Sequence, residues 1–226
     1  TIHLVLTGLL LRDLVRWLRT ESFTKMLENP LTNAGLLAPF ISLGMTFNIF
    51  IAVVRFFVPA MAENLQAFML PALIAWSVLW ALLLYTEIKL LGISFSKDFD
   101  VNQIHFGWLL HPFALGMITV VGTGIAAMSK SANIAHTAAF MSAISGSMGL
   151  FLLAVKVTAI FKSHFNASGL PAKQFLPSLL IVVPNITLYA ISGFRLAHYA
   201  NHQFGVDAHA LQLAADICHA IETNPS

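Results

Sequence analysis

Small and polar side chains form one-sided stripes along apolar segments that also contain proline. In the segment Ile104–Met128 the stripe consists of Pro112, Gly116, Thr119 and Thr123. Their spacings of four, three and four residues place them on one helix face. Two further stripes are Gly35, Pro39, Ser42 and Thr46, and, beside Pro184, the residues Ser178, Asn185, Tyr189 and Ser192. Hydroxyl, amide and glycine surfaces are weakly polar, so they could guide a partly dehydrated ion without holding it tightly. The candidate pore-lining residues are Pro39, Ser42, Thr46, Pro112, Gly116, Thr119, Thr123, Pro184 and Asn185.

Close helix packing is the alternative explanation of each stripe, because small residues at four-residue spacing let helices approach one another in a membrane. A similar stripe without proline is present in the segment Asn133–Phe161, at Ala138, Ser142, Ser145 and Gly149. A proline inside a helix removes one backbone hydrogen bond and bends the axis. In a bilayer, broken backbone is tolerated only where it faces protein or a water-filled cavity. Because three stripes coincide with prolines, we predict bent inner helices around a path, wrapped by straighter outer helices.

Segment length and composition predict an all-α polytopic membrane protein. Hydrophobic residues make up 58% of the 226 residues and charged residues 10%, whereas a soluble domain carries about 25% charge. A membrane span needs roughly 20 predominantly apolar residues. We expect membrane helices at Thr1–Leu18 (a partial one), Asn33–Phe57, Asn64–Leu90, Ile104–Met128, Asn133–Phe161 and Phe175–Tyr199, within a transmembrane domain over residues 1–203. Residues 204–226, with five charged or histidine side chains, are expected to be a polar tail or the start of a further helix.

Positive charges collect on the longer connections between these segments. Eight lysines and arginines lie on or beside them, against three on the opposite side. The positive-inside rule therefore places the longer connections in the cytoplasm. In this orientation the second, fourth and sixth segments all run outward and are mutually parallel, as hairpins around a central pore require. We expect a multi-pass protein of the cell (inner) membrane.

Charged residues within the apolar segments are expected near segment ends, where they reach the interface. These are Glu87, Lys89, Lys156 and Arg195. An ion-coupled carrier usually needs an ionisable group inside the membrane, so this distribution favours a channel or a facilitative pore. Phenylalanines that could obstruct such a pore are Phe40, Phe47, Phe50, Phe106 and Phe113.

The sequence shows no catalytic constellation, phosphate-binding loop or metal-ligand spacing. We therefore expect no enzyme activity, no catalytic residue, no cofactor and no metal site. A net charge of +2 without a basic cluster argues against a nucleic-acid partner.

Two other function classes stay open at this point. Paired histidines on facing helices can ligate haem, and His136 and His198 are expected at the same depth, so a haem-binding membrane cytochrome subunit is one alternative. A membrane anchor subunit that transports nothing is the other. A Soret band would support the first, and ion flux through reconstituted liposomes would exclude the second.

Three proline-containing motifs precede or open the second, fourth and sixth segments. They are Glu28-Asn29-Pro30-Leu31-Thr32, then His105-Phe106-Gly107-Trp108 through His111-Pro112 and Gly116, and Phe175-Leu176-Pro177-Ser178-Leu179 through Pro184. These motifs resemble those before the third helix and in the fifth and seventh helices of the tellurite-resistance/dicarboxylate transporter family, which includes the slow-type anion channels. Asn185 stands where the family has a second proline.

The resemblance implies a ten-helix fold in which five hairpins form a quasi-five-fold ring, with bent odd-numbered inner helices. The chain would cover part of the second helix to the seventh. Relatives are homotrimers of separately conducting protomers, obstructed by a phenylalanine of the ninth helix, for which this chain has no matching region. The resemblance further implies passive conduction of small anions, inorganic or dicarboxylate, through a channel or facilitative transporter in the lipid bilayer.

Overall fold

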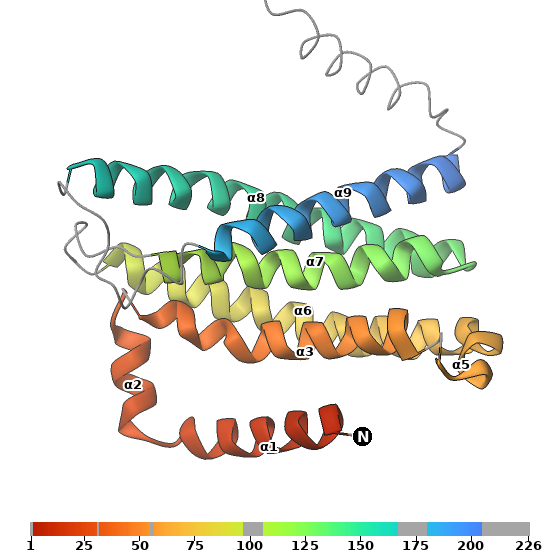
Figure 1. The fold of residues 1–226 in the computed structure, drawn as a ribbon, viewed down its shortest axis with the longest axis horizontal. Coiled ribbons are helices and arrows are strands. Elements are labelled where there is room, and N and C mark those ends of the chain that lie inside the picture. Colours follow the sequence, from red (N-terminus) through yellow and green to blue (C-terminus); the bar gives the residue numbers. More distant parts are fainter. Residues whose placement is uncertain (1, 31, 55–56, 97–105, 167–179, 205–226) are drawn as a thin grey trace, which may run out of the picture.

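The computed structural model describes residues 2–30, 32–54, 57–96, 106–166 and 180–204. Helices and connecting turns make up these ranges, and no strand occurs in them (Figure 1). In chain order the elements are α1 Ile2–Trp17, α2 Glu21–Glu28, the 3-10 helix η1 Asn33–Leu37, α3 Ala38–Asn48, the π-helical turn η2 Ile49–Val54, α5 Pro59–Glu63, α6 Leu65–Ser96, the 3-10 helix η4 Phe106–Leu109, α7 Leu110–Met128, α8 Ala132–Asn166 and α9 Val182–Phe204. The all-α expectation is confirmed. Residues 205–226 and the first half of the third motif, residues 175–179, lie outside the described residues.

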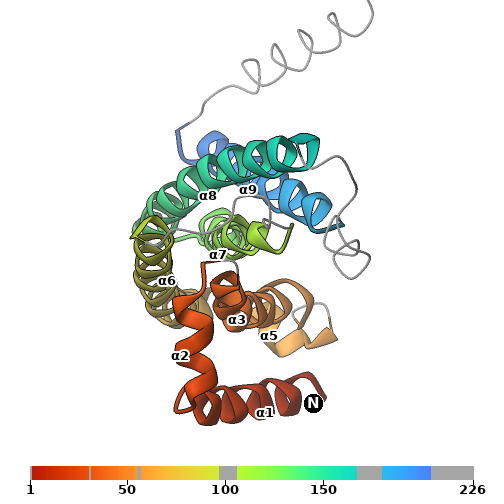
Figure 2. The ribbon, with the colours of Figure 1, turned by 90° about the vertical axis from the view of Figure 1, so that its left-hand side faces the viewer.

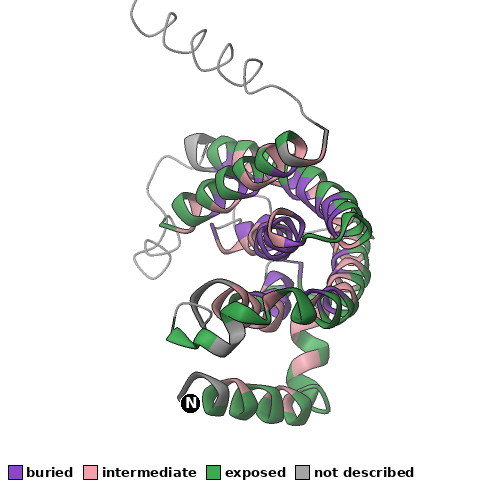
Figure 3. Ribbon diagram, turned by 90° about the vertical axis from the view of Figure 1, so that its right-hand side faces the viewer, coloured by how far each residue is buried: buried purple, intermediate pink, exposed green. Residues whose placement is uncertain are grey.

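The helix α7 occupies the centre of the bundle. In its most apolar stretch 89% of the residues are buried. In the corresponding stretches of the spans that contain α3, α6 and α8, the share of buried residues is 22%, 28% and 39%. Figure 2 shows α6 and α8 as an arc around one side of α7, with α3 and α9 on either side of the remaining face. In Figure 3 the buried positions gather on α7 and on the helix faces turned toward it. Of the three helices that we expected to form an inner ring, α7 is shielded by its neighbours, whereas the span that contains α3 is the least buried of the four.

Four of the described helices are long and apolar enough to cross a membrane. They are Asn33–Ile51, Leu65–Ser96, Phe106–Met128 and Ala132–Ser163. The expected first and sixth segments are present as α1 and α9 but do not reach these limits. With 16 residues, α1 is short, and the second half of α9 contains Arg195, His198 and Asn201. The long apolar helices make the chain a helical membrane protein.

Proline occupies the first turn of all three helices that we expected it to bend. Pro39 follows the 3-10 helix η1 at the start of α3, Pro112 follows η4 at the start of α7, and Pro184 is the third residue of α9. First-turn N–H groups have no partner within the helix, so proline costs little there and its fixed φ favours the helical start. In the continuous helices Asn33–Ile51 and Phe106–Met128, Pro39 and Pro112 are each the seventh residue, so the expected bends at these prolines stay a prediction. The proline inside a long helix is Pro71, in the outer helix α6.

Two short helices occupy connections that the sequence predicted to be loops. In α2, Thr20 precedes the helix in an extended conformation, Glu21 lies in the first turn, and Lys25 pairs with Glu21 at 3.9 Å. Thr20 and an acidic first turn are typical of a helix start, so the sequence carried this signal. The other short helix is α5, which lies between the end of η2 and α6.

The core between α6 and α7 is fixed by a tryptophan. Trp76 is fully buried, and its Nε1 donates a hydrogen bond of 3.0 Å to the carbonyl of Ile118. Gly122 permits this contact, since a Cβ there would overlap the Trp76 ring and the Ser142 hydroxyl. Small residues thus bring α6, α7 and α8 into close contact, as in other membrane helix pairs.

Candidate functional site

The three helices that begin with a proline, α3, α7 and α9, enclose a groove of about 560 Å³. Its lining residues come from α3, the first residue of η2, α7 and α9, and Figure 2 shows α3 and α9 on either side of the face of α7 that α6 leaves uncovered. We call it the central groove. Its lining consists of Met45, Asn48, Ile49, Phe113, Met117, Val120, Val183, Pro184, Thr187, Leu188, Ile191 and Arg195.

Arg195 is the charged residue of the central groove, and the described part of its lining contains no acidic side chain. Its Nη1 donates a hydrogen bond of 2.6 Å to the carbonyl of Val120. Gly124 leaves room for the guanidinium, because a Cβ at that position would lie 3.0 Å from Nη1. Within the described ranges no carboxylate pairs with Arg195. A guanidinium carries five N–H donors, so Arg195 has more donors than its hydrogen bond to Val120 uses.

The other polar groups of the groove are tied to the backbone. Asn48 donates through Nδ2 to the carbonyl of Gly44 at 3.3 Å, and it contacts Met117 Sδ at 3.7 Å. The hydroxyl of Thr187 donates to the carbonyl of Val183 at 2.9 Å. The groove is therefore mostly apolar, with one cationic side chain held in place by a main-chain carbonyl.

The predicted stripe of α7 faces its neighbouring helices and not the central groove. Thr119 donates to the Leu115 carbonyl at 2.7 Å and lies 2.9 Å from the Ser145 hydroxyl of α8. Thr123 donates to the carbonyl of Val120 at 3.1 Å, and a Cβ on Gly116 would lie 3.1 Å from the Tyr189 ring. The groove is lined by the adjacent face of α7, through Phe113, Met117 and Val120. The two faces differ by one sequence position.

The predicted stripes of α9 and α3 divide between several surfaces. Pro184 lines the central groove, whereas Asn185 is buried and donates to the carbonyls of Ile181 at 2.9 Å and Leu109 at 3.4 Å. Ser42 is partly buried, and its carbonyl accepts the hydroxyl of Thr46 at 2.9 Å. Pro39 lies on a third surface, an apolar cleft between α1, α2, α3 and α6. Ser178 lies outside the described residues.

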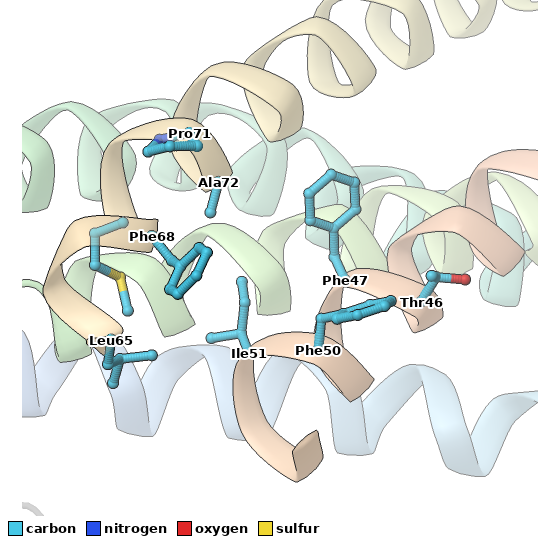
Figure 4. Close-up of a pocket in the computed structure, with 9 residues that line it drawn as sticks. Thr46, Phe47, Phe50, Ile51, Leu65, Phe68, Pro71 and Ala72 are labelled. Carbon is cyan, nitrogen blue, oxygen red and sulfur yellow. The ribbon is translucent and has the colours of Figure 1, made fainter. Parts of the chain in front are cut away.

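Thr46 belongs to a separate apolar groove between α3 and α6, with a volume of about 400 Å³. Figure 4 shows Phe47, Phe50 and Ile51 on one side of it and Leu65, Phe68, Pro71 and Ala72 on the other. Phe47 and Phe50, two of the predicted obstructing rings, thus lie on this lateral surface. Of the five phenylalanines considered, Phe113 lines the central groove.

Hydrogen bonds from three directions hold the start of α7. Trp108 donates to the carbonyl of Pro30 at 2.8 Å, Asn185 of α9 donates to the carbonyl of Leu109, and Tyr189 of α9 donates to the carbonyl of Pro112. Leu109, Pro112 and the donor Trp108 lie where the chain changes from 3-10 to α-helix at the start of α7, and Pro30 precedes η1. The described parts of the second and third motifs, together with Pro30 of the first, therefore meet in one junction, which we call the α7 junction.

An ionisable cluster lies beside the α7 junction, and the sequence analysis missed it. Glu87 of α6 and His111 of α7 are fully buried, with Glu87 Oε1 2.7 Å from His111 Nδ1. Lys156 of α8 is 6% exposed, and its Nζ lies 4.5 Å from the centroid of the Trp108 ring, a cation–π distance. The expectation of interface exposure is wrong for Glu87 and Lys156, which are buried among neighbouring helices, and it stays a prediction for Arg195, which is partly exposed.

Helical spacing carried a signal for two of these residues. Glu87 shares a face with the buried leucines Leu79, Leu83 and Leu90. Arg195 lies four positions after Ile191, on the groove face of α9. A charged residue in register with a buried face is expected to be buried with a partner.

The contacts of His136 and His198, on α8 and α9, give the haem alternative no support. His136 Nδ1 is hydrogen-bonded to the hydroxyl of Tyr199, and the two rings meet edge to face at 5.9 Å. His198, the other expected ligand, is exposed. His105 lies outside the described residues, and in the described ranges no group of three or more His, Cys, Asp or Glu side chains forms a metal site.

Comparison with known protein families gives a match over nearly the whole chain. The model of the voltage-dependent anion channel family matches residues 2–223. Comparison with curated proteins and with solved structures found no significant match. The family match confirms the resemblance to the slow-type anion channels that the three motifs predicted.

Proposed function

The chain belongs to the voltage-dependent anion channel family, and from this premise we propose that it passes small anions along the central groove. As an anion channel or transporter with several long apolar helices, it is a multi-pass membrane protein. The observation that supports the groove as the path is its charge: one guanidinium, no carboxylate on the described lining, and otherwise apolar or neutral side chains.

Fixed positive charge is what an anion needs in an apolar passage. An anion that enters such a passage loses water, and its desolvation is expensive unless a cation or N–H donors replace the water. Arg195 supplies both, and its 2.6 Å hydrogen bond to Val120 holds the guanidinium against α7. A hydrogen bond to a charged group contributes about 1.5 to 3 kcal/mol. That range is strong enough to select anions and weak enough to release them.

Of the nine predicted pore-lining residues, Pro184 lines the central groove, and three others make hydrogen bonds between helices. Asn185 and the carbonyl of Pro112 join α9 to α7, and Thr119 joins α7 to α8. Phe113 is the largest ring on the lining of the groove. It is therefore the residue that we assign to the narrow part of the path.

Assembly and placement are part of the same proposal. We retain a homotrimer in the cell membrane, with the longer connections on the cytoplasmic side, and either inorganic anions or small dicarboxylates as the transported class. Chemical crosslinking in native membranes would test the trimer. A panel of anions in the flux assay below would separate the two classes by size and charge.

The test is anion flux through liposomes that contain the purified protein, with the wild type compared with Arg195→Gln. At subsaturating anion concentration, loss of about 1.5 to 3 kcal/mol lowers flux by roughly 10- to 100-fold. Arg195→Lys keeps the charge and should retain most of the flux. The matched control is Arg12→Gln, at an exposed arginine of α1 outside the groove. Flux through Arg195→Gln equal to that through Arg12→Gln would show that the anion does not pass this guanidinium.

A further inference from the structure

Three helices each contribute one ionisable side chain to the cluster beside the α7 junction. Glu87 comes from α6, His111 from α7 and Lys156 from α8. From the fourth neighbouring helix, α9, Tyr189 interacts electrostatically with Glu87. Lys156 interacts in the same way with both Glu87 and His111. Ionisable groups inside a membrane are costly, and those that occur there mark ion or proton sites.

The Glu87–His111 pair is incompletely satisfied. In the described part of the chain, Glu87 Oε2 and His111 Nε2 are buried without a hydrogen-bond partner. With the Nδ1 proton donated to the Glu87 carboxylate, both of these atoms are proton acceptors. A purely structural ion pair is normally completed by donors to its remaining lone pairs, since buried polar groups without partners are rare and destabilising. This pair instead keeps two sites open to an additional proton.

We infer that the Glu87–His111 pair is a proton-binding site whose occupation promotes anion passage through the central groove. A proton from solution adds to His111 Nε2, or to Glu87 Oε2, and no covalent bond breaks. With Glu87 negative and Lys156 positive, this proton changes the net charge of the three groups from zero to +1. The inference rests on the proposed function, because the anion in the groove is the partner of that charge.

The α7 junction connects this charge to the groove. His111 is followed by Pro112, whose carbonyl accepts the Tyr189 hydroxyl, and then by Phe113 on the lining of the groove. Leu188, which precedes Tyr189, also lines the groove. A positive charge in surroundings of low dielectric constant attracts an anion more strongly than in water. Binding linkage is reciprocal, so an anion in the groove must also favour the proton.

The first experiment measures anion flux through reconstituted wild-type protein between about pH 8 and pH 5.5, the range in which histidine chemistry is accessible. The pH is equal on both sides, and the membrane potential is clamped with a potassium ionophore. Flux should rise on the order of 5-fold or more as the pH falls, the usual size of a coupling between sites. Glu87→Gln and His111→Gln should each flatten this profile. The control Glu21→Gln, at an exposed carboxylate of α2, should keep it.

A second experiment needs no variant and therefore does not depend on whether the substituted proteins fold. A transported anion is added to weakly buffered wild-type protein in detergent, and proton uptake is followed with a pH indicator dye. Uptake of protons by the wild type supports the inference, and the same addition to Glu87→Gln should give none.

The outcomes separate the two proposals. Measurable anion flux that is independent of pH, or pH-dependent flux that persists in both Glu87→Gln and His111→Gln, overturns the proton site and leaves the anion path intact. No anion flux at any pH overturns the proposed function itself. If both variants fail to give a monodisperse protein, the wild-type pH profile and proton uptake decide, and the absence of either one overturns the inference.

Discussion

Replacing Gly149 by alanine tests the contact that holds α9 against α7 and α8. A Cβ at position 149 of α8 would overlap the hydroxyl of Tyr189 and lie 2.9 Å from its Cζ and 3.0 Å from Leu115 Cβ. The ring cannot withdraw toward α7, because Gly116 already lies against it, with its own ideal Cβ position 3.1 Å from Cζ. The hydroxyl must therefore leave the carbonyl of Pro112 to which it donates.

The expected destabilisation follows from three contributions. Overpacking a close-packed interior costs about 1 to 3 kcal/mol. The lost hydrogen bond costs about 0.5 to 1.5 kcal/mol. Alanine is favoured over glycine in a helix by about 1 kcal/mol, which offsets part of this. We expect a net loss of about 1 to 3 kcal/mol in the free energy of unfolding.

The assay is thermal unfolding in detergent, followed by tryptophan fluorescence. The matched control is Gly193→Ala in α9, where an added Cβ meets no atom within 4 Å, so this variant should be as stable as the wild type or more so. In the double variant Gly149→Ala with Tyr189→Phe, removal of the hydroxyl relieves the worst overlap, and the combined loss should be smaller than the sum of the single losses. A Gly149→Ala melting temperature equal to that of Gly193→Ala would refute the packing described for the α7 junction.

Two further substitutions separate packing from conduction. Thr119→Val keeps the shape of the side chain and removes its hydrogen bond to Ser145. The free energy of unfolding should therefore fall by about 1 kcal/mol, with little change in anion flux per folded protein. A large loss of flux at unchanged stability would show that Thr119 lines the path. Phe113→Ala removes the largest ring on the groove lining and should raise anion flux into liposomes. Phe140→Ala, at an exposed ring of α8, is the control. Lower or equal flux through Phe113→Ala would show that the narrow part of the path lies elsewhere.

The positions of the long apolar helices were predictable from the length of their apolar runs. The expected segments Ile104–Met128 and Asn133–Phe161 correspond to η4 with α7 and to α8, with boundaries that differ by up to five residues. Apolar run lengths do not reveal how a helix begins. Pro39 and Pro112 each follow a change from 3-10 to α-helix, and hydropathy along the sequence does not show this change.

The site was harder to predict because one-residue differences on a helix move a side chain to another face. Two consecutive residues are separated by about 100° around the axis. In α7 the small polar residues and the larger apolar residues therefore form adjacent stripes. Pro112, Gly116 and Thr119 suit close contact with α8 and α9, whereas Phe113, Met117 and Val120 line the groove. The sequence pattern identified a helix that lines the groove, but it did not show which face of that helix is turned toward the groove.

Burial of charge was the least predictable feature, since it depends on partners far apart in the sequence. Glu87 and His111 lie 24 positions apart and meet through the α6–α7 contact. Neither residue would be stable at that depth alone, because an unpaired ion in an apolar interior is strongly disfavoured. Hydropathy along one segment alone predicts that such a residue lies at the nearest helix end. In the structure, a partner on a neighbouring helix stabilises it in the interior.

The need to satisfy main-chain groups at helix starts explains why the three motifs meet at the α7 junction. Each motif supplies either a carbonyl or a donor at the start of a helix: the carbonyl of Pro30, the indole of Trp108, and the amide of Asn185. Helix starts between 3-10 and α geometry have main-chain groups without intrahelical partners, and inside a membrane protein these must be satisfied by neighbouring side chains. Parallel helices place their starts at the same depth, so residues that satisfy one helix come from the others. In this chain the motifs at helix starts therefore specify how α7 is joined to its neighbours, and the groove between α3, α7 and α9 follows from that arrangement.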